Sequence, residues 1–195
     1  GAMATTGTQV IVPSRKGEAG TEHLNVVLQA TLNPPSPDKR EHRFREFTYR
    51  EGDRVMQVRN NYDLAWEREN GMEGAGVFNG DIGVIEAINE SDGNLRIRFE
   101  DRVVSYEFSL LEDLEPAYAV TVHKSQGCEY PIVILPLGNV PPMLRSRNLL
   151  YTAVTRAQCI AIIVGREDIL CDMVRNDRQT MRYTGLCQRL KECGE

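Results

Sequence analysis

Residues 117–129 read Ala-Tyr-Ala-Val-Thr-Val-His-Lys-Ser-Gln-Gly-Cys-Glu, and this stretch decides the fold. Its first half, up to Val122, has the small and β-branched residues of a buried strand. Its second half is polar, with Gly127 at the corner, and polar groups gathered where a strand ends usually form a site. Residues 131–138 then form a short apolar run, which predicts a buried strand of an α/β sheet. A plain solvated loop between two strands remains an alternative for these residues alone.

A helix followed by a strand is predicted over residues 147–165. Thr155 and Arg156 fall near the end of this helix, and the strand at 159–164 closes at Gly165. Taken alone, an arginine there is most simply explained by its favourable interaction with the helix dipole. The apolar positions that recur at helical spacing are Leu149, Leu150, Ala153, Val154 and Ala157.

The beginning of the chain predicts a strand, a loop and a helix. The strand at residues 9–12 stops at Pro13, and a polar, glycine-bearing loop follows at 14–20. We expect Thr21 to cap a helix that ends before the prolines that follow Asn33. The predicted apolar face of this helix consists of Leu24, Val27, Leu28, Thr31 and Leu32.

The middle of the chain has the pattern of short antiparallel strands. Strands are predicted at residues 54–58, 82–88, 95–99 and 104–108, with turns at Asn79-Gly80 and at 91–94. Four or five such strands indicate a small antiparallel barrel. The charged segment 36–49 is expected to be an exposed connection, and 63–76 a mobile loop. Two further helices are predicted at 167–174 and 184–192.

Composition limits the class of protein. The chain has 195 residues, enough for one large or two small domains, and no apolar run near the roughly 18 residues of a membrane span. We expect a cytoplasmic protein without a signal peptide, and residues 1–3 resemble the remnant of a cleaved tag. Five cysteines without a Cys-x-x-Cys pair indicate reduced, mostly packed thiols and no metal site. The net charge of −5 disfavours bulk coating of nucleic acid but allows a narrow binding groove.

Two stretches together resemble motifs V and VI of superfamily 1 helicases. They are Val-His-Lys-Ser-Gln-Gly-Cys-Glu at 122–129 and Leu-Tyr-Thr-Ala-Val-Thr-Arg at 150–156, and the RecD-like (RecD/TraA) DNA helicases are the most similar branch. The loop Pro-Ser-Arg-Lys-Gly at 13–17 resembles motif IV of that branch. The runs at 52–57, 60–61 and 78–83 resemble the sequences that flank its inserted barrel.

The resemblance implies an α/β fold with two parts. A RecA-like parallel-sheet motor domain, P-loop NTPase-like but without its own P-loop and called 2A, would comprise residues 4–50 and 115–195. A small antiparallel Src-homology-3-like barrel, called 2B, would be inserted at 51–114. The chain would then be a C-terminal fragment of the helicase.

The residues needed to hold ATP phosphates are missing from this sequence. The lysines are Lys16, Lys39, Lys124 and Lys191, and none follows a glycine as in a Walker phosphate loop. We therefore expect ATP and Mg²⁺ to be bound mainly by a first motor domain outside this sequence. By resemblance, Arg156 is an arginine finger in trans, with Lys16 or Arg15 as a second cation. Which of these two faces ATP stays open.

The resemblance also assigns binding residues. Gly127, Glu129 and Gln126 would contact the nucleotide. Single-stranded DNA at a duplex junction would be contacted by Thr121, His123, Lys124, Asn60, Asn61 and Asn79. For His123 an ordinary loop histidine is the alternative, for Lys124 a structural role, and for the motif IV loop a solvated basic loop. The barrel arginines Arg96, Arg98 and Arg102 are left outside the site as a solvated face.

The expected function is the C-terminal part of an ATP-dependent helicase that moves 5′ to 3′ on single-stranded DNA. Alone, the fragment should lack ATPase activity. A non-enzymatic module that binds nucleic acid or protein is the alternative from another class. The helicase half of a conjugative relaxase, or an RNA-directed relative, is the alternative among enzymes.

Overall fold

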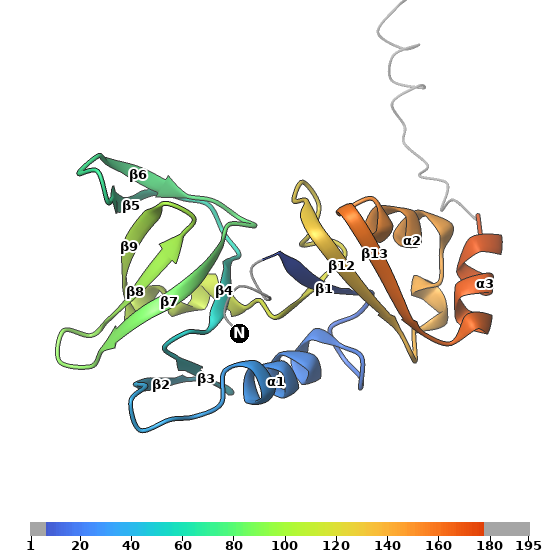
Figure 1. Ribbon diagram of the computed structural model, residues 1–195, viewed down its shortest axis with the longest axis horizontal. Helices are drawn as coiled ribbons and strands as arrows, with labels where there is room; N and C mark the ends of the chain where they lie inside the picture. The colour runs from blue at the N-terminus through green and yellow to red at the C-terminus, as the bar shows by residue number, and fades with distance from the viewer. Residues whose placement is uncertain (1–6, 178–195) are drawn as a thin grey trace, which may run out of the picture.

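The computed structural model describes residues 7–177, which form a four-stranded sheet, a seven-stranded sheet and a separate two-stranded hairpin (Figure 1). The first sheet is parallel and has the strand order β11-β1-β12-β13. Strand β1 lies between β11 and β12, so it pairs with two segments that are both far from it in sequence. The strands are β1 (Thr8–Val12), β11 (Ala119–Thr121), β12 (Tyr130–Leu137) and β13 (Ala157–Gly165).

Two helices cover one face of this sheet. They are α2 (Arg147–Val154) and α3 (Glu167–Arg175), with a short 3-10 turn, η3, at Pro142–Leu144. The Ser146 hydroxyl caps α2 by accepting a hydrogen bond from the Leu149 amide. The helix and strand predicted over 147–165 are therefore confirmed, as is the helix predicted at 167–174. The helix predicted at 184–192 lies outside the described residues. The core of this part contains Val133, Leu135, Leu137, Leu149, Leu150 and Ala153.

The apolar strand predicted at 159–164 forms, but its side chains are exposed among the residues that the structure describes. Ile160, Ile162 and Val164 of β13 are 50%, 43% and 54% exposed. Their partners across the strand pair, Ile132 and Ile134, share the same face of the sheet. An apolar pattern alone predicts a strand, and whether a second layer covers it depends on other parts of the molecule.

Helix α1 (Thr21–Leu32) begins where predicted, but the predicted cap and apolar face are wrong. The N-cap is Gly20, and a Cβ atom at this position would come within 2.4 Å of the Arg15 carbonyl oxygen, so the site favours glycine. The buried side chains of the helix are Asn25 and Gln29, whereas Val27 is 43% exposed. The helix docks through amide groups against a strand edge and a buried carboxylate, so an apolar periodicity could not locate its inner face.

The second sheet is antiparallel and curls on itself (Figure 1). Its strand order is β10-β4-β7-β8-β9-β5-β6. The predicted strands and both predicted turns are present, and Gly80 and Gly93 adopt the positive φ angles that these turns require. The elements are β4 (Arg54–Gln57), β5 (Asn61–Arg68), β6 (Glu73–Val77), β7 (Ile82–Asn89), β8 (Asn94–Phe99), β9 (Arg102–Glu107), the 3-10 turn η2 (Phe108–Asp113) and β10 (Leu114–Pro116).

The mobile loop predicted at 63–76 is instead most of the β5–β6 hairpin. Trp66 lies opposite Gly74, and a Cβ atom at Gly74 would come within 2.4 Å of the indole ring. Gly74, one of the glycines that suggested a loop, therefore makes room for a large aromatic side chain across the strand pair.

The exposed connection predicted at 36–49 is also wrong. Strands β2 (Glu41–Phe44) and β3 (Phe47–Arg50) form a hairpin in which Phe44 pairs with Phe47. Tyr49 is buried in the barrel core, where its hydroxyl donates to the Leu114 carbonyl at 3.0 Å. Phe44 and Phe47 pack against the same core. We infer that residues 41–50 belong with the barrel, on the far side of the boundary predicted at 50/51.

One buried carboxylate ties the hairpin, α1 and both sheets together. Asp53 is fully buried and accepts four hydrogen bonds. Its donors are Gln29 Nε2 at 2.6 Å, Asn33 Nδ2 at 2.7 Å, the Arg50 amide at 2.8 Å and the Tyr118 hydroxyl at 2.9 Å. Burial raises the pKa of Asp53, and the hydrogen bonds from Asn33, Arg50, Gln29 and Tyr118 oppose that rise.

Among the residues that the structure describes, no helix has the length and apolar character needed to cross a lipid bilayer. Three of the cysteines fall in this range as free thiols. Cys159 is exposed, in contrast to the mostly packed thiols predicted, and Cys128 and Cys171 are half-buried.

We predict that Asp53→Asn lowers the free energy of unfolding by about 2–4 kcal/mol, because the new amide NH₂ group would face two hydrogen-bond donors. Urea denaturation followed by circular dichroism measures this. Asp63→Asn, at an exposed position of β5, is the matched control and should change stability by no more than about 0.5 kcal/mol. Equal stability of the two variants would contradict the role of Asp53.

Candidate functional site

The loop at 122–129 runs from the carboxyl end of β11 to the amino end of β12, and internal hydrogen bonds hold its shape. Ser125 is fully buried, and its hydroxyl donates to the Val122 carbonyl at 2.8 Å. The Thr121 hydroxyl accepts from the Lys124 amide at 3.3 Å. Gly127 has φ +87°, and a Cβ atom there would meet no atom within 4 Å. The loop therefore has a fixed inner turn and leaves Gly127 open to solvent.

Arg156 lies at the amino end of β13, directly against the far end of this loop. Its guanidinium donates to the Cys128 carbonyl at 3.1 Å and to the Thr152 carbonyl at 3.3 Å. Its own carbonyl accepts from the Tyr130 amide at 2.8 Å. Within residues 7–177, no carboxylate forms an ion pair with this half-buried guanidinium. Neutral carbonyl groups thus orient the arginine without neutralising its charge.

The residues predicted to contact the nucleotide lie at this same edge. Gln126, Gly127 and Glu129 are exposed, and the Glu129 carboxylate accepts from Gln158 Nε2 at 3.3 Å. The Cys128 carbonyl accepts a hydrogen bond from Arg156, so these residues and the arginine form one group at the amino ends of β12 and β13. We refer to this group as the amino edge.

Arg15 and Lys16 lie elsewhere. They follow the carboxyl end of β1. In the parallel pair of β1 and β12, Val10 lies opposite Ile134, so Val12, two residues further on, lies at the level of Pro136. Arg156, in contrast, precedes β13 at the level of Tyr130. Six residues of β12 separate the two levels, or about 20 Å at ~3.3 Å per residue. The structure therefore does not bring Arg15 and Lys16 together with Arg156.

Of the predicted strand-binding residues of motif V, Thr121 is buried, Lys124 is paired and His123 is exposed. Thr121 ends β11 at the carboxyl edge, the edge that also carries Arg15 and Lys16. Lys124 forms an ion pair with Glu115, as its structural alternative anticipated. His123 is exposed. The cation of Lys124 is therefore partly satisfied by the protein itself.

The barrel asparagines approach the amino edge. Asn60 accepts a hydrogen bond from the Asn79 amide at 2.9 Å, which joins the two segments. The Asn79-Gly80 turn contacts the motif V loop, where the Cys128 thiol lies 3.8 Å from the Gly80 carbonyl. At the start of β5, the Asn61 side-chain oxygen accepts a hydrogen bond from the Asp63 amide at 3.2 Å.

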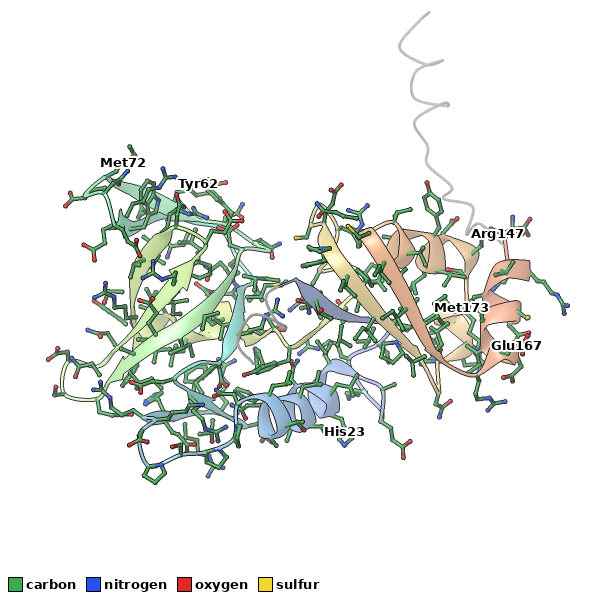
Figure 2. The ribbon with its side chains drawn as sticks, viewed as in Figure 1. His23, Tyr62, Met72, Arg147, Glu167 and Met173 are labelled. Atoms are coloured by element: carbon green, nitrogen blue, oxygen red, sulfur yellow. The ribbon has the colours of Figure 1, made fainter. Side chains whose placement is uncertain are left out.

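Sequence reasoning missed an exposed aromatic pair beside these asparagines. The rings of Tyr62 and Phe78 meet edge to face at 5.7 Å, and the two side chains are 67% and 41% exposed. Figure 2 shows Tyr62 on the outer end of the barrel, away from its core. The aromatic residues next to Asn61 and Asn79 in sequence could have signalled this pair.

Sequence reasoning also missed Asn25, which fixes the strand that carries Thr121. Its side-chain amide donates to the Ala119 carbonyl at 3.0 Å and accepts from the Ala119 amide at 2.9 Å. β11 pairs with β1 on one side only, so Asn25 takes the place of a further strand on the other side.

Comparison with known proteins identifies the family. The family model described as the ATP-dependent RecD-like DNA helicase SH3 domain matches residues 24–99. The model of the UvrD-like helicase C-terminal domain matches residues 116–164. The chain belongs to the RecD-like helicase family. The resemblance found in the two sequence motifs is thus confirmed, and the two matched domains follow one another in the predicted order.

Curated relatives agree with this assignment. The ATP-dependent RecD2 DNA helicase of Deinococcus radiodurans is 36% identical over 183 residues, which cover 94% of this chain and 23% of the relative. The RecBCD enzyme subunit RecD of Mycolicibacterium smegmatis is 30% identical over 186 residues, covering 95% of this chain and 30% of the relative. The chain therefore spans less than a third of the length of either relative.

Solved structures confirm the predicted fold. The Pif1 structure from Bacteroides bound to ssDNA has a TM-score of 0.51 at 18% identity and covers 95% of this chain and 45% of that one. Pif1 helicase from Candida albicans has a TM-score of 0.52 at 11% identity and covers 95% of this chain and 50% of that one. The parallel sheet is RecA-like and the antiparallel sheet is an SH3-like barrel.

We predict that Asn25→Ala lowers the free energy of unfolding by about 2 kcal/mol, because it leaves the buried Ala119 amide and carbonyl without partners. Hydrogen exchange of the Ala119 amide should accelerate more than that of the Val133 amide in β12. Val26→Ala, at a 53% exposed position on the same helix, serves as control. Unchanged exchange at Ala119 in the Asn25 variant would refute this anchoring role.

Proposed function

We propose that this chain supplies the arginine finger and part of the strand grip of an ATP-dependent DNA helicase that moves 5′ to 3′. The observation that carries the proposal is the state of Arg156. Its guanidinium lies beside Gly127 and Glu129, is held by two carbonyl groups, and forms no ion pair within the described residues. The direction of movement rests on the family resemblance.

The chemistry of phosphoryl transfer explains why such an arginine is useful. Negative charge spreads over the transferring γ-phosphoryl group, and a guanidinium delivered across a cleft stabilises it. A private carboxylate partner would cancel this charge in advance. Carbonyl partners leave the charge available while they restrict the side chain to one direction.

The amino edge also fits the sugar and phosphate side of a nucleotide. Gly127 exposes its backbone and has no Cβ atom, so a phosphate or ribose can approach closely. Gln126 and Glu129 are exposed on either side and offer hydrogen-bonding groups. ATP supplies the phosphoryl group, and Mg²⁺ with the phosphates is held mainly by the first motor domain. A Pif1 structure from Bacteroides in complex with ADP-AlF3 and ssDNA, with a TM-score of 0.52 at 17% identity, supports this proposal.

We assign the DNA strand to the opposite, carboxyl edge of the parallel sheet. Thr121, His123 and Lys124 lie at or after the end of β11, and polar side chains of this kind bind phosphates without reading sequence. The position of Arg15 and Lys16 at this edge favours the strand rather than ATP as their partner. Asn60, Asn61 and Asn79 lie on the side of the amino edge, and we propose that they contact a different part of the strand, where it passes the barrel.

We predict that Arg156→Ala, in the polypeptide that carries this sequence together with its first motor domain, reduces ATP turnover by about 10³ to 10⁵. Nucleotide affinity should change little, because the finger acts mainly in the transition state. Arg156→Lys should also be defective, since lysine lacks the planar fork. Steady-state phosphate release and nucleotide titration measure the two effects.

Arg166→Ala is the matched control for this experiment, because Arg166 lies at the other end of β13 and pairs with Asp168 at the surface. Its turnover should equal that of the unmodified enzyme. Normal turnover by the Arg156→Ala enzyme would remove the finger assignment.

We also predict that the 195-residue chain alone has no DNA-stimulated ATPase activity and only weak DNA affinity, because its sequence contains no phosphate-cradling loop. Phosphate release in the presence of oligothymidylate is the measurement, with the longer polypeptide as positive control. Turnover that copurifies with the short chain and persists after further purification would refute this prediction.

A further inference from the structure

A cavity of about 600 Å³ lies where the parallel sheet meets the barrel and the β2–β3 hairpin. Its walls come from α1, the hairpin, η2, β10 and the end of β11. Small-molecule sites span about 300–1,000 Å³, so the cavity is large enough for a planar ring system. The lining includes Thr121 and Lys124 of the carboxyl edge.

The hairpin contributes aromatic walls to this cavity. Phe44 and Phe47, a cross-strand pair, both line it and are only partly buried. Between them Arg45 adopts φ +55°, a left-handed conformation that is rare for a side chain other than glycine. This turn places the Arg45 guanidinium 5.0 Å from the centre of the Phe44 ring. A flat ligand would find aromatic faces on one side and a planar cation at the rim.

The charges around the cavity argue against a phosphate inside it. Each cation that lines it has an acidic partner that lines it as well. Arg15 pairs with Glu22 at 3.8 Å, Arg45 with Glu112 at 3.5 Å, and Lys124 with Glu115. An anion would have to displace these carboxylates, whereas a neutral heteroaromatic ring would not. The polar groups at the rim could still bond the edge of such a ring.

We propose that this cavity receives an unpaired base of the DNA strand that crosses the carboxyl edge. This inference rests on the proposed function, because the strand must cross the carboxyl edge, where Thr121 and Lys124 line the cavity. Stacking of bases on aromatic side chains is a sequence-tolerant way to hold single strands. The hairpin that forms the walls would thus act as a base clamp in a motor that must grip any sequence.

The test compares a strand that has bases with one that does not. The 195-residue chain is titrated into fluorescein-labelled dodecathymidylate and into a twelve-unit abasic deoxyribose phosphate strand, and binding is followed by fluorescence anisotropy. We expect about tenfold tighter binding of the thymidylate, a typical gain for one or two stacked bases. Phe47→Leu should reduce this ratio to about threefold by weakening only the binding of thymidylate.

Two further variants make the result decisive. Arg45→Gln, at an exposed position, should lower the ratio in the same direction without loss of core packing. Tyr151→Leu, at a 70% exposed position on α2, is the aromatic control and should keep the tenfold ratio. Circular dichroism and thermal melting establish that each variant is folded, and Arg45→Gln carries the test if Phe47→Leu does not fold.

The outcomes separate the two proposals. If folded Phe47→Leu and Arg45→Gln retain the wild-type ratio, the base pocket is refuted while the strand grip stands. That result would point to a protein segment as the occupant of the cavity. If the unmodified chain binds neither strand up to millimolar concentration, the proposed strand grip fails and the pocket fails with it.

Discussion

The buried carboxylate of Asp53 is the interaction on which the arrangement of the two sheets depends. A charge in an apolar interior is stable only when its hydrogen-bonding capacity is filled, and four donors from three separate parts of the chain fill it. Gln29 and Asn33 donate from α1 and its end, Arg50 donates from the hairpin, and Tyr118 donates from the residues that lead into the parallel sheet. Any relative rotation of these parts would leave at least one oxygen of the carboxylate under-bonded. The carboxylate therefore fixes the hairpin beside the carboxyl edge, which is what creates the aromatic cavity.

The direction of the strands imposes the second constraint. All strands of a parallel sheet end on one side, so residues that follow strands and residues that precede them occupy opposite edges. Arg156 precedes β13, whereas Arg15, Lys16 and Thr121 follow β1 and β11. The backbone positions of these two groups therefore lie at opposite edges of the sheet. The separation favours two ligands, a nucleotide at the amino edge and a polymer at the carboxyl edge.

Features that depend on the local pattern of apolar and polar residues could be predicted from the sequence. Features that depend on contacts between distant parts of the chain could not. Apolar periodicity located β12, α2 and most barrel strands, and the motif residues identified the family. It could not locate the inner face of α1, because Asn25 and Gln29 are buried for their hydrogen bonds and not for hydrophobicity. It misjudged the β5–β6 hairpin, because Gly74 was interpreted as a loop residue, whereas it lies opposite Trp66 and leaves room for the indole ring. It could not place Lys16 and Arg156 relative to each other, because sequence order carries no information about which edge of the sheet a loop occupies.

The motif V loop connects the two edges, and its construction determines what can pass between them. Thr121 and Lys124 lie at one end and Gly127 to Glu129 at the other, with the buried Ser125 between them. Because Ser125 is bonded to Val122 and Arg156 to Cys128, the short loop has little freedom to absorb a displacement internally. The loop therefore fixes its two ends relative to each other, because Lys124 is paired with Glu115 at one end and Cys128 is bonded to Arg156 at the other.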